Sequence, residues 1–202
     1  MNKTINYYNH AYETLAQNYE NANVSNIHSL LINTFNKKNK LLEIGCGSGR
    51  DASFMFNHGY DVIAIDGSKN MIQEAKRVHP NISNKLLQKV LPRELNFTNK
   101  FDGIYSIATL MHLSINDLKE SLSKIYNLLE NNGQFLMSVS LNRNDIDENG
   151  FDENGRYFLT LKENEWIELL KEIGFIVKNS IKNEDGLNRK SIQWLTIISK
   201  KQ

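Results

Sequence analysis

The sequence predicts a doubly wound α/β fold, and three observations lead to that prediction. Short apolar runs alternate with helical patterns from about residue 40 onward. A glycine-rich turn, Gly45-Cys46-Gly47-Ser48-Gly49, follows the first apolar run, and an acid, Asp66, ends the second. Alternating strands and helices form a parallel sheet with helices on both faces. Ligands of such sheets bind at the carboxyl edge of the strands, where we expect the glycine turn and Asp66 to meet.

Each predicted strand is an apolar or β-branched run bounded by turn residues. The runs cover residues 41–44, 60–65, 85–90, 101–107, 135–141, 175–181 and 192–199. The polar segment between the last two runs is too short for a helix, so these strands should pair antiparallel. The sequence therefore predicts seven strands, mostly parallel, that end in an antiparallel hairpin.

Helix signals separate these strands. The first helix, 51–58, ends at Gly59. Ser68 and Ser114 are predicted caps of helices that reach about Val78 and Leu129, and residues 131–133 form a turn. A capping box at 160–163 opens a helix that Gly174 ends. Two helices, 4–19 and 24–35, precede the first strand, and the acidic loop 142–155 lies on the ligand side.

Length and composition fit one ordinary globular domain. The chain has 202 residues, 40% of them hydrophobic and 23% charged, and a formal net charge of +1. That charge gives no general attraction to nucleic acid or to anionic membranes. The polar N-terminus, the single cysteine and the lack of an apolar run of ~20 residues predict a cytoplasmic protein. We expect one domain over 1–202, with a helical lid at 1–38 and a cofactor-binding core at 39–202, in a monomer or homodimer.

The glycine turn has two readings on its own. Glycine adopts positive φ and leaves no Cβ between the backbone and a ligand, so the turn can hold a nucleotide-like cofactor. It can also be a plain tight turn. The dinucleotide fingerprint fails, because Arg50 stands where its third glycine would be. Asp66 is placed to accept both hydroxyls of a ribose.

Taken together, these motifs resemble class I S-adenosylmethionine-dependent methyltransferases over nearly the whole chain. Residues 42–49 resemble the first motif of that family, and residues 64–68 with Met71 the second. Residues 101–113 are similar to its fourth-strand motif. Residues 128–135 are similar to the segment before strand five, where Asn131-Asn132-Gly133 replaces Pro-Gly-Gly. Residues 49–51, 155–158 and 193–195 resemble a subgroup of small bacterial single-domain members.

The resemblance implies a Rossmann-like sheet and S-adenosylmethionine as cofactor, with S-adenosylhomocysteine as product. Glu43, Gly45 and Gly47 would hold the methionine part. Asp66 would bind the ribose, and the exit of strand four would lie under the sulfonium. The positions expected to bind cofactor are Tyr8, Tyr12, Glu43, Gly45, Cys46, Gly47, Arg50, Asp66, Gly67, Met71, Val90, Leu91, Ser106 and Ile107.

Methyl transfer from a sulfonium mainly requires alignment of the acceptor, so a catalytic residue is not obligatory. His112, past strand four, is the candidate base, since its unperturbed pKa lies near ~6.5; it is equally suited to cap the next helix. Tyr8 and Tyr12 are candidates for a lid over the sulfonium, and Tyr12 also for a catalytic role. Tyr7 and Tyr19 are assigned to ordinary packing.

Three arginines predict an anionic substrate. Arg143, Arg156 and Arg189 lie in loops or at strand starts, and arginine binds carboxylate or phosphate through two N–H groups, although each can also be a solvated surface residue. Arg50 is expected to pair with the cofactor carboxylate or with an acid, Asp51 or Asp102. Cys46 is read as a small buried thiol, and the histidines show no metal-ligand spacing.

These observations favour methyl transfer to O, N or S of a small, possibly anionic, metabolite. Nucleic acid is not expected as a partner, since no basic stripe is present. Protein or RNA methylation is the alternative enzymatic reading. A non-catalytic S-adenosylmethionine-binding partner protein is the alternative from a different class.

Overall fold

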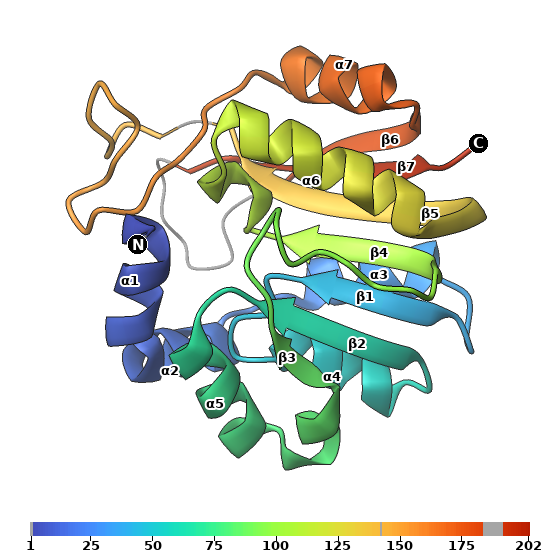
Figure 1. The fold of residues 1–202 in the computed structure, drawn as a ribbon, viewed down its shortest axis with the longest axis horizontal. Helices are drawn as coiled ribbons and strands as arrows, with labels where there is room; N and C mark the ends of the chain where they lie inside the picture. Colours follow the sequence, from blue (N-terminus) through green and yellow to red (C-terminus); the bar gives the residue numbers. More distant parts are fainter. Residues whose placement is uncertain (1, 142, 184–191) are drawn as a thin grey trace.

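The computed structural model describes residues 2–141, 143–183 and 192–202, which form a seven-stranded sheet between two layers of helices (Figure 1). The strand order is β3-β2-β1-β4-β5-β7-β6. Strands β1 to β5 pair in parallel, and β7 runs antiparallel between β5 and β6. The predicted doubly wound sheet with an antiparallel C-terminal pair is confirmed. The strands are β1 (Lys40–Ile44), β2 (Asp61–Asp66), β3 (Leu86–Gln88), β4 (Phe101–Ile107), β5 (Leu129–Ser140), β6 (Ile176–Asn183) and β7 (Trp194–Lys200).

Two apolar layers hold the helices on the two faces of the sheet. Successive strand residues point to opposite faces. Leu41 therefore packs in the layer that contains Met55, and its neighbour Leu42 in the layer that contains Leu122 and Trp166. Helices α3 (Ser25–Thr34), α4 (Arg50–Asn57) and α5 (Lys69–Val78) cover the first face, and α6 (Ile115–Leu128) and α7 (Glu163–Ile173) the second.

Most predicted helix ends are confirmed. The Ser68 hydroxyl accepts the Met71 N–H at 3.1 Å, and the Ser114 hydroxyl accepts the Asp117 N–H at 3.2 Å. Both bonds satisfy first-turn donors that the helix leaves unpaired. Gly174 ends α7 with φ of 111°, a left-handed conformation that favours glycine.

The capping box at residues 160–163 is wrong. Helix α7 begins at Glu163, and its N-cap residue is Lys162. The Lys162 backbone N–H donates to the Glu165 carboxylate at 2.6 Å. The acid that reaches back to the cap is therefore Glu165, two residues later than predicted. The sequence offers two acids at suitable spacing, and the packing of the apolar face of α7 decides between them.

Two shorter predictions also need correction. Strand β3 covers only Leu86–Gln88: the 3-10 helix η1 (Pro80–Lys85) includes Lys85, and beyond the strand the Val90 N–H donates to the Glu94 side chain at 2.7 Å. The predicted turn at 131–133 lies inside β5. The pairing with β4 jumps from Leu129 to Gln134, and Asn132 takes a φ of 63°. The turn residues thus form an irregularity in the strand rather than a separate turn.

The helix predicted at 4–19 is two helices, α1 (Lys3–His10) and α2 (Tyr12–Asn21), which meet at Ala11. Alanine has the highest helix propensity, so the residue itself does not explain the break. The backbone carbonyl of Asn9 accepts the Asn70 side-chain amide at 2.7 Å, and the Asn9 side chain accepts the Ser68 hydroxyl at 2.7 Å. Both bonds join the end of α1 to α5, directly before the break at Ala11.

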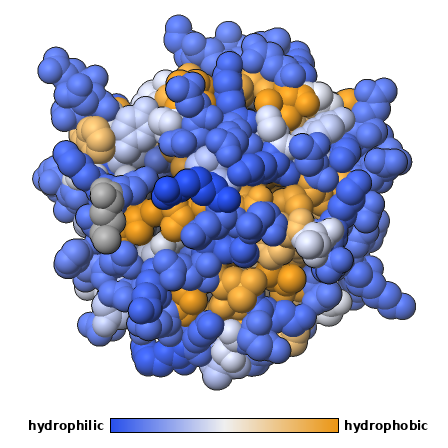
Figure 2. Space-filling model, viewed as in Figure 1, coloured by the Kyte–Doolittle hydropathy of each residue, from blue (hydrophilic) through white to orange (hydrophobic). Residues whose placement is uncertain are grey.

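The carboxyl edge of the sheet lies under α1, α2 and the loop between β5 and α7 (Figure 1). The chain leaves β1 toward β2 and β3, then returns to β4 for the other half, so the switch in strand order falls between β1 and β4. The Tyr157 N–H donates to the Thr4 hydroxyl at 2.9 Å, which fixes the loop to α1. Figure 2, in the same view as Figure 1, shows mostly hydrophilic side chains with apolar areas between them. Among the described residues, no helix combines the length and apolar character needed to cross a bilayer.

Candidate active site

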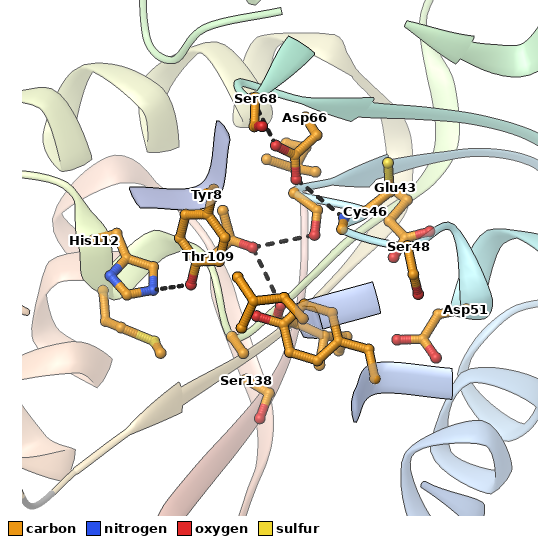
Figure 3. A pocket seen from close by; sticks show the side chains of 18 of the residues that line it. Tyr8, Glu43, Cys46, Ser48, Asp51, Asp66, Ser68, Thr109, His112 and Ser138 are labelled. Atoms are coloured by element: carbon orange, nitrogen blue, oxygen red, sulfur yellow. Dashed lines mark hydrogen bonds between the residues drawn. The ribbon is translucent and has the colours of Figure 1, made fainter. Parts of the chain in front are cut away.

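A cavity of about 590 Å³ lies at this switch point. Its walls come from the ends of β1, β2, β4 and β5, from α1 and α2, and from the loop after β5. Figure 3 shows Tyr8, Thr109 and His112 on one side, Glu43, Ser48 and Asp51 on the other, and Asp66 and Ser68 between them. The volume is in the range of small-molecule and cofactor sites, ~300–1,000 Å³.

The glycine turn after β1 forms the floor of one end of the cavity. Gly45, Gly47 and Gly49 all have positive φ, at 78°, 52° and 82°. The N–H groups of Gly45 and Cys46 both donate to the Ile65 carbonyl, at 2.7 and 2.9 Å. A Cβ on Gly45 would lie 1.9 Å from the Thr109 hydroxyl oxygen. The turn therefore needs glycine both for its backbone angles and for its close contact with the end of β4.

Asp66 completes this end of the cavity from the tip of β2. One carboxylate oxygen accepts the Gly47 N–H at 3.0 Å, and the other accepts the Ser68 N–H at 2.8 Å (Figure 3). Burial raises the pKa of Asp66, and these two hydrogen bonds oppose the rise. Each oxygen of a carboxylate has a second lone pair. Asp66 can therefore accept two further hydroxyl groups from a ligand while it holds the turn.

Glu43 is buried beside the turn, within β1. Its carboxylate accepts the Tyr105 hydroxyl at 3.2 Å. Burial, then the neighbouring Asp51 carboxylate, raise the pKa of Glu43 well above its usual range. A buried carboxyl of this kind exists either protonated or next to a cation. It is suited to receive the positively charged part of a ligand.

Arg50 pairs with an acid of this chain, the second of the two alternatives that the sequence left open. Its guanidinium donates to both oxygens of Asp51, at 2.8 and 3.0 Å, and to the Tyr19 carbonyl at 2.6 Å. The His28 imidazole lies 2.9 Å from the same carboxylate. Burial raises the pKa of Asp51, but the His28 and Arg50 contacts outweigh it and lower the pKa to about 2.

Helix α2 is held against the glycine turn by a second polar cluster. Glu20 accepts the Ser48 hydroxyl at 2.5 Å and lies 3.1 Å from the His79 ring nitrogen. With the Arg50 bond to the Tyr19 carbonyl, this cluster places the Tyr19 ring over Gly47, where a Cβ on the glycine would lie 3.3 Å from the ring. The turn is thus closed from above by α2.

Most residues predicted to bind the cofactor line the cavity. Those that do are Tyr8, Glu43, Gly45, Cys46, Gly47, Arg50, Asp66, Gly67, Leu91 and Ile107. Four others lie outside its walls. The Met71 side chain is buried behind the turn, the Ser106 hydroxyl donates to the Ile44 carbonyl at 3.0 Å, and the Val90 N–H donates to Glu94 at 2.7 Å. The fourth, Tyr12, is discussed next.

Tyr12 was expected in the lid and in catalysis, and the structure places it elsewhere. Its hydroxyl donates to Glu13 at 2.9 Å, and it does not line the cavity. Tyr19, which was assigned to packing, lines the cavity together with Tyr8. The break at Ala11 explains why Tyr19 lines the cavity and Tyr12 does not. Residue spacing predicts which side chains share a helix face only within one continuous helix, and this helix is interrupted at residue 11. Tyr7 was also assigned to packing, and it lies outside the cavity walls.

The other end of the cavity holds His112, in the 3-10 helix η2 (Leu110–His112), and Tyr8. The His112 Nδ1 lies 2.7 Å from the Tyr157 carbonyl oxygen, and Nε2 lies 3.2 Å from the Tyr8 hydroxyl. A carbonyl only accepts, so Nδ1 carries the hydrogen and Nε2 is left as the acceptor. The Tyr8 hydroxyl therefore donates to His112. The predicted helix cap is Ser114, so His112 is not needed there.

Two of the three predicted arginines reach this end. Arg143 lies 3.8 Å over the Phe158 ring and donates to Asp145 at 2.7 Å. Arg156 lies 5.3 Å from the centre of the same ring and donates to Asp152 at 2.7 Å. Both arginines and Phe158 line the cavity, whereas neither aspartate does. The third, Arg189, lies outside the described residues.

Acid sensitivity is expected from His112. Burial lowers the pKa of His112 to about 4, the Tyr157 hydrogen bond opposes this, and Arg156 and Arg143 add to it. Between the unfolded value near ~6.5 and the folded value, the unfolded chain binds more protons, so the free energy of unfolding falls as pH falls. The full loss in the free energy of unfolding is on the order of 3 kcal/mol.

Urea unfolding tests this expectation. Between pH 6.5 and 4, His112→Gln should lose less free energy of unfolding than the natural chain. His10→Gln, at an exposed histidine, should match the natural chain, and identical slopes for all three would contradict the assignment.

Several wall residues were not predicted, and they share one feature. Tyr19, Ser48, Ser138, Phe158, Asn183 and Trp194 come from six separate parts of the chain and join the cavity only through the fold. Thr109, in the exit of strand four that is expected under the sulfonium, lines the cavity. Ser138, Asn183 and Trp194 lie where β5, β6 and β7 meet, and no local pattern distinguishes them from other strand residues.

The cavity is built to hold an elongated nucleotide-like cofactor beside a smaller ligand. Glycine backbone forms the cradle, a carboxylate with two free acceptor positions ends β2, and a buried carboxyl faces the same space. No group of three potential metal ligands gathers among the residues that the structure describes. The fold and the site thus define a Rossmann-like α/β protein with a cofactor cradle at its switch point.

Comparison with known proteins supports one family. Residues 41–133 match a family model described as "Methyltransferase domain". Over 108 residues the chain is 34% identical to the Ubiquinone biosynthesis O-methyltransferase of Pelagibacter ubique, covering 53% of this chain and 44% of the relative. The chain spans about half the length of the curated relatives it matches. These matches and the fold support the class I S-adenosylmethionine-dependent methyltransferase family.

Solved structures share its fold. The 1,6-didemethyltoxoflavin-N1-methyltransferase of Burkholderia thailandensis, with bound 1,6-didemethyltoxoflavin and S-adenosylhomocysteine, aligns with a TM-score of 0.81 and 20% identity. The alignment covers 99% of this chain and 88% of that structure. TehB from Haemophilus influenzae aligns with a TM-score of 0.70 and 18% identity over 95% of this chain and 67% of that one.

Proposed function

We propose that this protein transfers a methyl group from S-adenosylmethionine to an O, N or S atom of a small, anionic metabolite. One observation carries the proposal: a single cavity has the glycine cradle and Asp66 at one end and His112, Arg143 and Arg156 at the other. The cofactor supplies an electrophilic methyl group on a sulfonium. The protein has to hold the acceptor in line with that group and keep water out.

Each part of the cradle has a matching part of the cofactor. Asp66 would accept the ribose hydroxyls with its two free acceptor positions, and Gly67 and Leu91 would border the adenine. Glu43, with the backbone of Gly45 and Gly47, would hold the methionine end, whose ammonium suits a buried carboxyl. Tyr8 and Tyr19 would close the site from above.

Binding is tested by thermal unfolding of the purified chain with S-adenosylmethionine and with S-adenosylhomocysteine. Stabilisation by both compounds is expected. A ligand that binds only the folded state raises the midpoint temperature of unfolding, and the rise grows with the logarithm of its concentration over Kd. No stabilisation by either compound would overturn the proposal.

Turnover is then tested with S-adenosylmethionine labelled in the methyl group and a bacterial extract split by size. Label only in the large fraction would favour a protein or RNA acceptor. Binding without any transfer would favour a non-catalytic partner protein.

A small acceptor is supported by the size of the cavity and by the relatives. The Burkholderia enzyme binds a small heteroaromatic compound, and the Pelagibacter relative is named for ubiquinone biosynthesis. The formal net charge of +1 offers no general attraction to nucleic acid. A cytoplasmic location and a monomeric or homodimeric state stay predictions.

The negative charge of the acceptor is argued from the two arginines. Nε and Nη2 of Arg143 contact Asp145, and Nε and Nη2 of Arg156 contact Asp152. Both aspartates lie outside the cavity wall. Arg143 and Arg156 both line the cavity. Arginine keeps its charge at any working pH and has five N–H donors. An acceptor with a carboxylate or phosphate group would bind between them.

Arg143→Gln should lower kcat/KM for the natural small-molecule pool by roughly 10- to 100-fold, the effect of one lost hydrogen bond to a charged group. Arg143 is a cleaner choice than Arg156, because Asp145 is half exposed whereas Asp152 is buried and would be left unpaired. Arg93→Gln, at an exposed arginine outside the cavity walls, is the matched control. The labelled product should be retained by an anion exchanger. A neutral or cationic product would contradict this assignment.

A further inference from the structure

A continuous chain of hydrogen bonds runs from the loop after β5 to the centre of the cavity. The Tyr157 carbonyl accepts the His112 Nδ1 hydrogen at 2.7 Å, and His112 Nε2 accepts the Tyr8 hydroxyl hydrogen at 3.2 Å (Figure 3). The Tyr157 N–H in turn donates to the Thr4 hydroxyl at 2.9 Å, one turn before Tyr8 on α1. Both ends of the chain are therefore fixed, and so is the direction of every hydrogen in it.

This direction leaves Tyr8, not His112, as the group with acceptor capacity toward the cavity. The lone pair of Nε2 is occupied by the Tyr8 hydroxyl. The Tyr8 oxygen, having donated its hydrogen, has two lone pairs, for which the Tyr19 hydroxyl, the Arg156 guanidinium and a bound acceptor compete. Arg156 and a hydrogen bond from Tyr19 both favour charge on this oxygen, against burial, which raises the pKa of Tyr8. Any negative charge that develops on the Tyr8 oxygen is thus met by a cation and a donor.

We infer that the Tyr8 hydroxyl oxygen contacts the methyl acceptor and takes the proton of its reacting atom, while the Tyr8 hydrogen passes to His112 Nε2. This inference rests on the proposed function. The reacting atom forms its bond to the methyl carbon, and the electrons of the broken carbon–sulfur bond stay on sulfur. Tyr8 receives one proton and gives one, so it ends neutral. His112 ends as an imidazolium and returns its proton to solvent when the product leaves. Tyr8 is then a catalytic residue and His112 acts through it.

Nitrogen NMR of the histidine rings tests the chain without an acceptor. In the natural protein His112 should show hydrogen on Nδ1 and a hydrogen-bonded, unprotonated Nε2 at pH 7. Tyr8→Phe, which keeps the ring and removes the hydroxyl, should shift the Nε2 resonance. Tyr12→Phe, at the tyrosine outside the cavity walls, should leave it unchanged. Hydrogen on Nε2, or no change in Tyr8→Phe, would overturn the inference.

Labelled-methyl transfer into the small-molecule fraction of the extract tests the chemistry. Tyr8→Phe and His112→Gln should each lower the rate at saturating acceptor by roughly 100-fold, the effect typical of lost acid–base catalysis, with stabilisation by S-adenosylmethionine retained. The double variant should be no slower than Tyr8→Phe, because members of one relay are not additive. Additive losses or a full rate in Tyr8→Phe would overturn the inference. Cofactor binding without any transfer by the natural protein would instead defeat the proposed function.

Discussion

Replacing Asp66 with alanine is expected to lower the affinity for S-adenosylmethionine by roughly 100-fold or more. The natural carboxylate holds the turn through the N–H groups of Gly47 and Ser68 and keeps two acceptor positions for the ribose. A hydrogen bond to a charged group contributes about 1.5–3 kcal/mol, so losing two such bonds to the ligand removes about 3–6 kcal/mol. Titration calorimetry with S-adenosylmethionine and S-adenosylhomocysteine measures the loss directly.

Two further variants separate the binding role of Asp66 from its role in the turn. Asp66→Asn keeps the shape but turns one acceptor oxygen into a donor, so its affinity should fall between those of the natural chain and Asp66→Ala. Asp61→Asn, at the start of the same strand, removes an exposed carboxylate that pairs with Lys85 at 2.5 Å. It should bind the cofactor normally. Full affinity of Asp66→Ala for S-adenosylmethionine would contradict the proposal that Asp66 binds the ribose.

Gly45→Ala is expected to lower the free energy of unfolding by about 2–5 kcal/mol. The φ of 78° costs an L-residue about 1–2 kcal/mol, and overpacking adds about 1–3 kcal/mol. The added Cβ would lie 1.9 Å from Thr109 Oγ1 and 2.5 Å from Thr109 Cβ. Truncating Thr109 to alanine would therefore not relieve the clash. For a chain of this size the midpoint of thermal unfolding should fall by roughly 4–20 °C.

Gly59→Ala is the matched control for this prediction. Gly59 also has a positive φ, 90°, yet a Cβ there would meet no atom within 4 Å. Gly59→Ala should therefore lower the free energy of unfolding only by the cost of the backbone conformation, about 1–2 kcal/mol. Cofactor affinity should be lost in Gly45→Ala and kept in Gly59→Ala. Equal destabilisation of the two variants would mean that the contact with Thr109 is not what requires glycine at position 45.

The fold and the cofactor end could be predicted because their signals are local. A strand is visible as an apolar run, and the glycine turn and Asp66 stand directly at strand ends, so the order of elements brings them together. Ser68 and Ser114 were found for the same reason, since a cap residue and its partner lie within three residues. Arg143 and Arg156 line the cavity because loops after β5 must lie on the carboxyl edge.

The lid could not be predicted in this way. The break at Ala11 follows directly on the contacts of Asn9 with Asn70 and Ser68, which are remote in sequence. Once α1 and α2 separate, Tyr19 replaces Tyr12 in the cavity. The hydrogen-bond partner of His112 is equally hidden, because the Tyr157 carbonyl belongs to a loop 45 residues away. Long-range backbone contacts leave no trace in the local pattern.

The loop that carries Arg143, Tyr157 and Phe158 is attached to α1, and both lie outside residues 41–133, the segment that matches the family model. His112 lies inside that segment and joins them through its bond to the Tyr157 carbonyl. The acceptor end of the cavity is therefore assembled from three separate stretches of the chain. Grafting α1 together with residues 143–158 onto a related protein should transfer the acceptor preference only where the recipient has a histidine at the position of His112. Exchanging either piece alone would separate Thr4 from Tyr157.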